Sequence, residues 1–155
     1  MNKNRKSLVF TLAVVIVILI MFVAILNRKQ YYPTNIDTTY SLASGIDFSA
    51  KFEDKSLACT IVNHNNSEMI YGEAYYLEKL MKGKWYEVVD AMGERASKKS
   101  WIAIANSIPA NGKKELTISL DDFRKLKQGK YRIVIPLGGE VMSKNIIIAN
   151  FQVGK

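Results

Sequence analysis

The residues of this sequence that could do chemistry are few, and their spacing does not combine them into a reactive site. Cys59 is the only cysteine and His64 the only histidine, so one chain can form neither a disulfide nor a Cys/His metal centre. Cys59 lies in the apolar run SLACTIVN, where we expect a buried, unreactive thiol. His64 lies in the polar turn NHNNS, where we expect exposure to solvent. The adjacent Asp121 and Asp122 should diverge, and we expect them to cap one helical turn over Asp121–Lys127.

Short catalytic and cofactor-binding motifs are also missing. The sequence holds no Gly-rich phosphate loop, no HExxH, no GxSxG and no cluster of Cys and His. We therefore expect a protein that is not an enzyme, with no catalytic, cofactor-binding or metal-binding residues, no small-molecule substrate and no nucleic acid partner. The alternative is an envelope enzyme, or an enzyme inhibitor, that uses a site without a known motif.

Five aromatic residues lie within the stretch YGEAYYLEKLMKGKWYEV, which is either a binding platform or a β-hairpin. Alternation with a period of two directs Tyr71, Tyr75 and Leu77 toward a core. The KGK turn places Gly83 where a positive φ is needed, and Trp85 then packs back across the sheet. We interpret the stretch as a hairpin.

Two charged positions of this hairpin carry specific expectations. Alternation directs Glu73 inward, where it either bonds a Tyr or a turn amide at a sheet edge or contacts a ligand. Glu78 and Arg132 fall on neighbouring strands, where we expect a cross-strand ion pair, which would be worth a few tenths of a kcal/mol if exposed.

The elements that position these residues are strands. Eight runs are rich in β-branched or aromatic residues and are separated by Gly, Asn, Pro or Lys turns. They are Thr39–Phe52, Ser56–Asn63, Met69–Met81, Lys84–Val89, Trp101–Ser107, Lys114–Leu120, Lys130–Pro136 and Asn145–Val153. About seven or eight short antiparallel strands at this spacing predict an all-β sandwich or barrel.

One tyrosine favours the sandwich. Tyr131 begins a strand directly after the turn at Gly129, as does the tyrosine of the tyrosine corner in immunoglobulin domains, so we expect its hydroxyl to bond back to the preceding connection. In those domains the second core cysteine lies two residues later, and Ile133 stands there. Cys59 and Ile133 would then replace the disulfide by packing.

The N-terminus has the pattern of a membrane anchor. Leu8–Leu26 comprises 19 uncharged residues, about 28 Å of helix, which matches the hydrocarbon thickness of a bilayer. Lys3, Arg5 and Lys6 precede it and predict a cytoplasmic N-terminus. We expect a basic tail at 1–7, a transmembrane helix at 8–26, a linker at 27–38 and an extracellular domain at 39–155. A cleaved signal peptide and a pilin-type helix are the alternatives, although the run lacks a small-x-small cleavage site and a pilin Gly and Glu.

Two separated blocks, NHNNSEMIYGEAYYLEKLMKGKWYEV and LDDFRKLKQGKYRIV, carry a family resemblance. These two blocks, and the order in which they follow one another, resemble those of the bacterial immunoglobulin-like domains found in membrane-anchored proteins and lipoproteins of Gram-positive bacteria. The resemblance extends over about Thr39–Val153, with Gln128 where the family usually has Pro. It implies an immunoglobulin-like β-sandwich in an extracytoplasmic setting, and no particular activity.

Basic residues provide the candidate binding surface. The net charge is +8, and it is +5 after residue 26 because three of the 22 Lys and Arg precede that residue. In immunoglobulin strand order, the KGK turn and the connection before Tyr131 lie at one end of the sandwich, about 30 Å from the membrane. We expect this end to bind an anionic cell-wall polymer or an acidic envelope protein, and lipid headgroups to lie beyond its reach. The candidate residues are Lys82, Lys84, Arg124, Lys125, Lys127 and Lys130.

Overall fold

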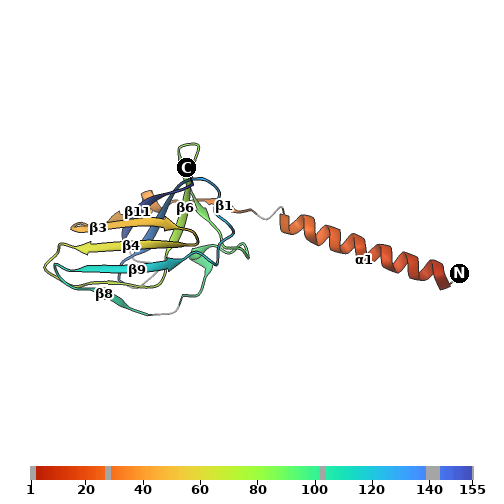
Figure 1. Ribbon diagram of the computed structural model, residues 1–155, viewed down its shortest axis with the longest axis horizontal. Helices are drawn as coiled ribbons and strands as arrows, with labels where there is room; N and C mark the ends of the chain where they lie inside the picture. Colours follow the sequence, from red (N-terminus) through yellow and green to blue (C-terminus); the bar gives the residue numbers. More distant parts are fainter. Residues whose placement is uncertain (1–2, 27–28, 102–103, 139–143, 155) are drawn as a thin grey trace.

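The computed structural model describes residues 3–26, 29–101, 104–138 and 144–154, which form an N-terminal helix and a β-domain (Figure 1). Helix α1 spans Lys3–Leu26, a segment without Gly or Pro. Several of its apolar side chains, including Phe10 and Ile18, are exposed. Among the described residues, no helix combines the length and the apolar content that crossing a membrane requires.

The larger sheet of the β-domain has six strands in the order β1-β7-β6-β10-β11-β2. Its antiparallel centre consists of β6 (Tyr76–Met81), β7 (Lys84–Val88), β10 (Gly129–Pro136) and β11 (Asn145–Val153). At one edge β1 (Tyr31–Pro33) pairs with β7, and at the other β2 (Ser41–Leu42) pairs in parallel with β11.

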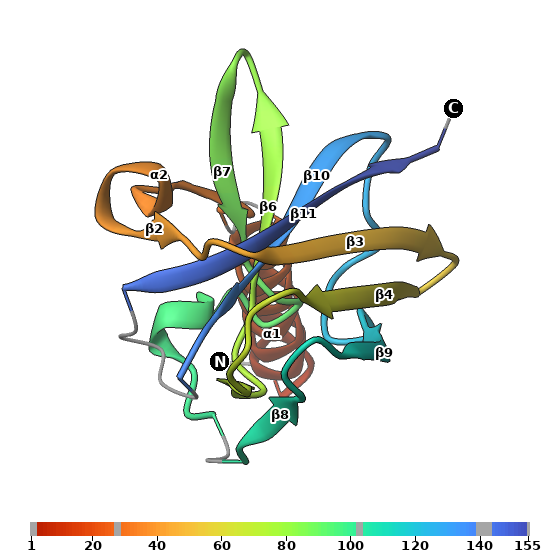
Figure 2. The same ribbon diagram turned by 90° about the vertical axis from the view of Figure 1, so that its left-hand side faces the viewer.

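A second layer faces this sheet. It contains a three-stranded sheet in the order β3-β4-β9, formed by β3 (Ile46–Glu53), β4 (Ser56–Asn63) and β9 (Lys113–Ser119). A separate pair joins β5 (Met69–Tyr71) to β8 (Asn106–Ile108). In Figure 2, β3 runs at a steep angle to β6 and β7 of the larger sheet, and β4 lies next to β3. The predicted all-β sandwich is confirmed.

The main core lies between the two layers. In β4 alternate side chains are buried, including Leu57, Cys59 and Ile61. They belong to the same hydrophobic cluster as Tyr131 and Ile133 of β10. Cys59 and Ile133 therefore both fill the core by packing, as the sequence predicted.

The predicted hydrogen bond of Tyr131 is present. This fully buried residue donates from Oη to the Lys127 carbonyl at 2.6 Å. Lys79, opposite Tyr131 in the β6–β10 register, donates from Nζ to the same carbonyl at 3.3 Å and to the Gln128 carbonyl at 3.1 Å. Gly129 has a φ of +151°, and a Cβ there would lie 3.0 Å from Lys79 Cε. The corner therefore requires a glycine beside the lysine.

The β6–β7 hairpin closes through a two-residue loop. Met81 pairs with Lys84, and the intervening Lys82 and Gly83 have φ values of +49° and +76°. Two positive φ values match the twist of the strands on either side. Beyond the loop, Trp85 reaches across β6, and the Arg132 guanidinium carbon lies 4.4 Å from the centre of its ring. The predicted turn and the packing of Trp85 are both confirmed.

The predicted cross-strand ion pair between Glu78 and Arg132 forms in the expected register, and it is buried. Glu78 is fully buried and Arg132 is 5% exposed. Helix α2 (Ile36–Thr39) lies over this face, where Asp37 accepts a second bond from Arg132 at 2.7 Å. Burial raises the pKa of Glu78, although Thr34 and Arg132 oppose the shift.

The predicted linker at 27–38 is wrong in part, because β1 lies within it and α2 begins within it. Val89 donates to the Gln30 carbonyl at 3.1 Å, so the sheet begins to pair immediately before Tyr31. Ile36 of α2 is buried in a second small apolar cluster with Tyr76 and Val134. These residues are therefore part of the domain.

Several predicted elements also differ in detail. Thr39–Phe52 divides into β2 and β3, and Met69–Met81 into β5 and β6. Residues 102–103 of the predicted strand Trp101–Ser107 lie outside the described residues, and the strand found there is the short β8. The predicted helical turn at Asp121–Lys127 is wrong, because Phe123 donates to Leu120 in a single tight turn and no helix follows.

Candidate binding groove and basic hairpin

A groove of about 510 Å³ runs along β9. Lys114 and Leu116–Ser119 of β9 line one part of it, and residues Tyr71–Tyr75 and Trp101 line another. Asn106, Asp122 and Ile135 complete the lining. Its volume falls within the range of about 300 to 1,000 Å³ that is usual for ligand sites.

Tyr75 joins the aromatic stretch to β9. Its Oη donates to the Ser119 carbonyl at 3.1 Å, and its ring centre lies 5.5 Å from that of Trp101 and 6.3 Å from that of Phe123. Burial, with a smaller effect of the Asp122 charge, raises the pKa of Tyr75 to about 12. Tyr75 therefore remains a hydrogen-bond donor at physiological pH.

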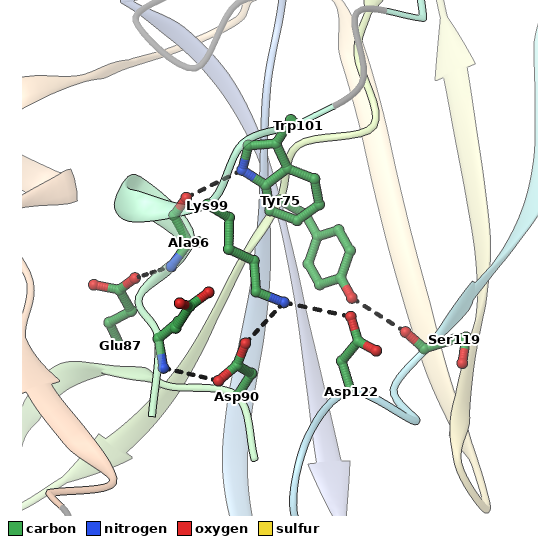
Figure 3. Close-up of polar contacts among 9 residues, drawn as sticks. Tyr75, Glu87, Asp90, Ala96, Lys99, Trp101, Ser119 and Asp122 are labelled. Carbon is green, nitrogen blue, oxygen red and sulfur yellow. Dashed lines mark hydrogen bonds and ion pairs between the residues drawn. The ribbon is translucent and has the colours of Figure 1, made fainter. Parts of the chain in front are cut away.

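Trp101 is fixed by the segment that precedes it (Figure 3). Its indole Nε1 donates to the Ala96 carbonyl at 3.0 Å. The buried carboxylate of Glu87 accepts from the Ala96 amide at 2.8 Å and from Arg95 Nε at 2.6 Å. The strand β7 thus holds the segment that carries Trp101.

Lys99 forms the second support, visible in Figure 3 between two carboxylates. Its Nζ lies 3.1 Å from Asp90 and 3.3 Å from Asp122, while Asp90 Oδ1 accepts from the Glu94 amide at 2.8 Å. Burial disfavours the charged forms of Lys99 and Asp90, but their hydrogen bonds and the attraction of opposite charges outweigh this effect. The pKa of Lys99 is therefore raised and that of Asp90 is lowered. This cluster stiffens the groove wall.

Glu73 lies at the groove, but its predicted inward orientation is wrong. Residues 72–75 leave the strand between β5 and β6, so the alternation ends there and Glu73 is exposed. Among the described residues it has no hydrogen-bond or ion-pair partner. Tyr71 and Leu77 are buried as predicted, and Tyr75 is half-buried.

The structure brings together part of the predicted basic surface. The contact of Lys79 with the Lys127 and Gln128 carbonyls places the connection before β10 beside the β6–β7 hairpin, and Lys130 follows on β10. Arg124 instead donates to the Ala91 carbonyl at 3.5 Å, beyond the other end of β7. Lys125 lines a second hollow of about 460 Å³ with Arg124, Asp54 and Val153. We call the exposed Lys82, Lys84, Lys127 and Lys130 the basic hairpin surface.

The β1–β7 register shows how far this surface lies from the residues that follow α1. Tyr31 lies opposite Val88, and Lys84 is at the other end of β7. Four residue steps at about 3.3 Å therefore separate Lys84 from this strand end by roughly 13 Å. The expected distance of about 30 Å from the membrane, and with it the exclusion of lipid headgroups, stays a prediction.

Of the residues that the sequence marked as potentially reactive, Asp122 lines the groove, whereas Cys59, His64 and Asp121 do not. Cys59 is buried, and burial raises its thiol pKa to about 11. His64 is exposed in its turn and contacts Asp47 Oδ2 at 2.8 Å. Asp121 accepts from Ser119 Oγ at 3.0 Å while Asp122 meets Lys99, so the two carboxylates diverge without capping a helix. Within the described ranges, no group of Cys, His, Asp and Glu could hold a metal ion.

The sequence did not identify the groove itself or its supports. Trp101 was assigned to a strand, and Asp90, Lys99 and Asp122 are separated by loops whose path no periodicity specifies. The one usable signal was the run DAMGE, in which an Asp three residues before a Gly is typical of a turn closed by the Asp side chain.

Comparisons with known proteins assign the domain to a family. A search of curated proteins finds no match. Among solved structures, the chain is similar to a Pseudomonas fluorescens alkylpurine DNA glycosylase, AlkC, bound to DNA containing an abasic site analog. The identity is 12%, the TM-score is 0.35, and the match covers 73% of this chain and 31% of that chain. The chain thus spans about a third of that protein. Residues 47–148 match the family model described as a bacterial Ig-like domain, and the chain therefore belongs to the bacterial Ig-like domain family.

Proposed function

We propose that this chain is a membrane-anchored Ig-like module that is exposed outside the cell and acts there by binding, not by catalysis. The partner that we propose is an anionic polymer of the cell wall, and an acidic envelope protein is the second possibility. The observation that carries this proposal is the uncompensated charge of the basic hairpin surface.

The support for the anchor comes from the sequence of α1. Its 19 uncharged residues from Leu8 to Leu26 follow three basic residues, which favours a cytoplasmic N-terminus. α1 ends at Leu26 and β1 begins at Tyr31. Five residue steps span at most about 18 Å, so an anchored domain would stay close to the membrane.

The support for binding comes from the side chains of the basic hairpin surface. All four lysines are exposed, and none has an ion-pair partner among the described residues. Other exposed lysines, such as Lys51 and Lys113, are each paired with a nearby Glu. Unpaired cations on one surface attract polyanions, and the attraction weakens as salt is added.

Retention on purified wall material tests this proposal. The full-length chain in detergent micelles would be applied at increasing salt, beside two variants that each lose three positive charges. The test variant changes Lys82, Lys84 and Lys127 to Gln, and the matched control changes Lys51, Lys98 and Lys113 to Gln. We expect the test variant to elute at lower salt than the control. Equal elution, or retention that salt does not affect, would contradict the proposal, and a loss seen only with anionic lipid vesicles would assign the surface to the membrane.

A further inference from the structure

Within the part of the chain that the structure describes, the outer edge of β9 has no partner strand. There β9 pairs with β4 alone, and the short strand β8 that precedes it pairs with β5 instead. In the immunoglobulin arrangement this sheet has four strands, the fourth lying beside the strand that corresponds to β9. Here the groove along β9 occupies that position.

The hydrogen-bond register shows which backbone groups face the groove. Leu120 donates to the Lys55 carbonyl and Asn63 to the Gly112 carbonyl, both at 2.8 Å. In an antiparallel ladder the bonded residues alternate, so the even-numbered residues of β9 bond to β4 and the odd-numbered residues point outward. The bond from Tyr75 Oη to the Ser119 carbonyl confirms this direction.

Thr117 lies at the centre of this free edge. No described group bonds its N–H or its carbonyl, and it lines the groove between Leu116 and Ile118. An extended chain is the ligand that bonds both the N–H and the carbonyl of one residue. It forms the same pair of hydrogen bonds again two residues further along the edge. A helix cannot supply this pair of bonds along an edge, because its own backbone N–H and carbonyl groups bond within the helix.

Side chains along the edge divide it into two halves. The first half carries the charged side chains of Lys113 and Glu115, which pair with each other. Charged side chains on an edge strand usually protect it from pairing with another chain. The second half, Leu116–Ser119, has no charge. This uncharged half adjoins Tyr75 and Trp101. Tyr75 already bonds the Ser119 carbonyl, so the part of this half that is open to a strand is the edge at Thr117.

We infer that the groove binds an extended peptide of a partner protein, which adds to β9 as a fourth strand of the sheet β3-β4-β9. The peptide has apolar side chains at alternate positions. These lie beside Leu116 and Ile118, which face the core side of the sheet, and its intervening residues face solvent. The inference deepens the proposed function, since it takes the domain as a binding module. It does not depend on the lysines that the wall-retention experiment changes.

Peptide selection tests the inference directly. A displayed library of random nine-residue peptides would be selected on the full-length chain in detergent micelles, and the best binders synthesised. Thr117→Pro removes the outward N–H without removing a bond to β4, and Thr117→Val keeps that N–H with a side chain of similar shape. We expect binding to Thr117→Val within about twofold of the original chain and binding to Thr117→Pro at least about tenfold weaker.

Amide exchange supplies a test that needs no folded proline variant. In the unmodified chain labelled with ¹⁵N-threonine, the Thr117 amide should exchange at least about tenfold more slowly when a selected peptide is bound. Thr60 is the internal control, because it lies in β4 between two paired strands and should be protected with or without peptide.

Three outcomes would overturn the inference. One is that no peptide is enriched, and another is that the selected peptides leave Thr117 exchange unchanged or bind Thr117→Pro as well as Thr117→Val. The third is a dimer of the chain that Thr117→Pro abolishes, which would assign the edge to a second copy. Retention on wall material would be unaffected by each of these results, so the two proposals fail separately.

Discussion

The tyrosine corner makes a quantitative prediction about the stability of the sandwich. Tyr131→Phe keeps the buried ring and removes only the hydroxyl that donates to the Lys127 carbonyl. That carbonyl would not be left without a donor, because Lys79 Nζ also reaches it at 3.3 Å. The substitution should therefore leave the fold intact.

The expected loss follows from these two bonds. A buried hydrogen bond contributes about 0.5 to 1.5 kcal/mol, and more is lost when a polar group remains unsatisfied. Since Lys79 still satisfies Lys127, we expect Tyr131→Phe to cost about 1 kcal/mol. In a Lys79→Met background the carbonyl would lose both donors, and the same change should cost about 2 kcal/mol.

Denaturant unfolding of the full-length chain in micelles, followed by near-ultraviolet circular dichroism, would measure both values. Tyr86→Phe is the matched control, because the hydroxyl of this half-buried residue has no described hydrogen-bond partner. A midpoint unchanged by Tyr131→Phe, or changed equally by Tyr86→Phe, would refute the reasoning. Equal costs in the two Lys79 backgrounds would refute the compensation by Lys79.

Three further predictions concern other parts of the domain. Asp90→Asn should cost about 1 to 2 kcal/mol at pH 7. The folded-state pKa of Asp90 is lowered, so its contribution is present above the unfolded pKa and disappears as the pH falls through the folded pKa. The two unfolding curves should therefore converge in acid, and a gap independent of pH would contradict this. Cys59 should resist a maleimide at pH 7.5 until denaturant is added, because burial raises its pKa to about 11; rapid labelling of the native chain would show an accessible thiol. External protease on spheroplasts should spare Tyr31–Pro33, because these residues pair with β7, and cleavage there would show that β1 is detached.

Local rules were sufficient for the features that depend on neighbouring residues. The KGK turn needed only the conformational freedom of Gly83, and the role of Tyr131 followed from its place after a Gly turn. The limits of β4 and β11 follow from continuous β-branched and apolar runs between turn residues.

Features that depend on distant packing could not be predicted in this way. The sequences of β1 and α2 have the composition of a polar linker, and three strand residues and one helical turn are too short to show a periodic pattern. Their position depends on Val88 and Arg132, far along the chain. The burial of the Glu78–Arg132 ion pair could not be predicted, because nothing in the sequence shows that α2 covers it. Glu73 turned outward because the strand that alternation assumed is interrupted there.

The groove was missed for the same reason. Its walls combine β9, the residues between β5 and β6, and Trp101, which are brought together by the sandwich and not by spacing. The free edge of β9 depends on β8 pairing with β5, and a strand pattern does not specify its partner.

Labelling of intact cells with a membrane-impermeant maleimide tests most directly the central claim, that the Ig-like domain is displayed outside the membrane. The buried Cys59 gives little background, so single substitutions report topology. Lys82→Cys places a thiol at the exposed hairpin loop, and Asn4→Cys places one before the apolar run. We predict that Lys82→Cys reacts in intact cells and that Asn4→Cys reacts only after lysis. Protection of Lys82→Cys until lysis, or reaction of Asn4→Cys in intact cells, would contradict the account.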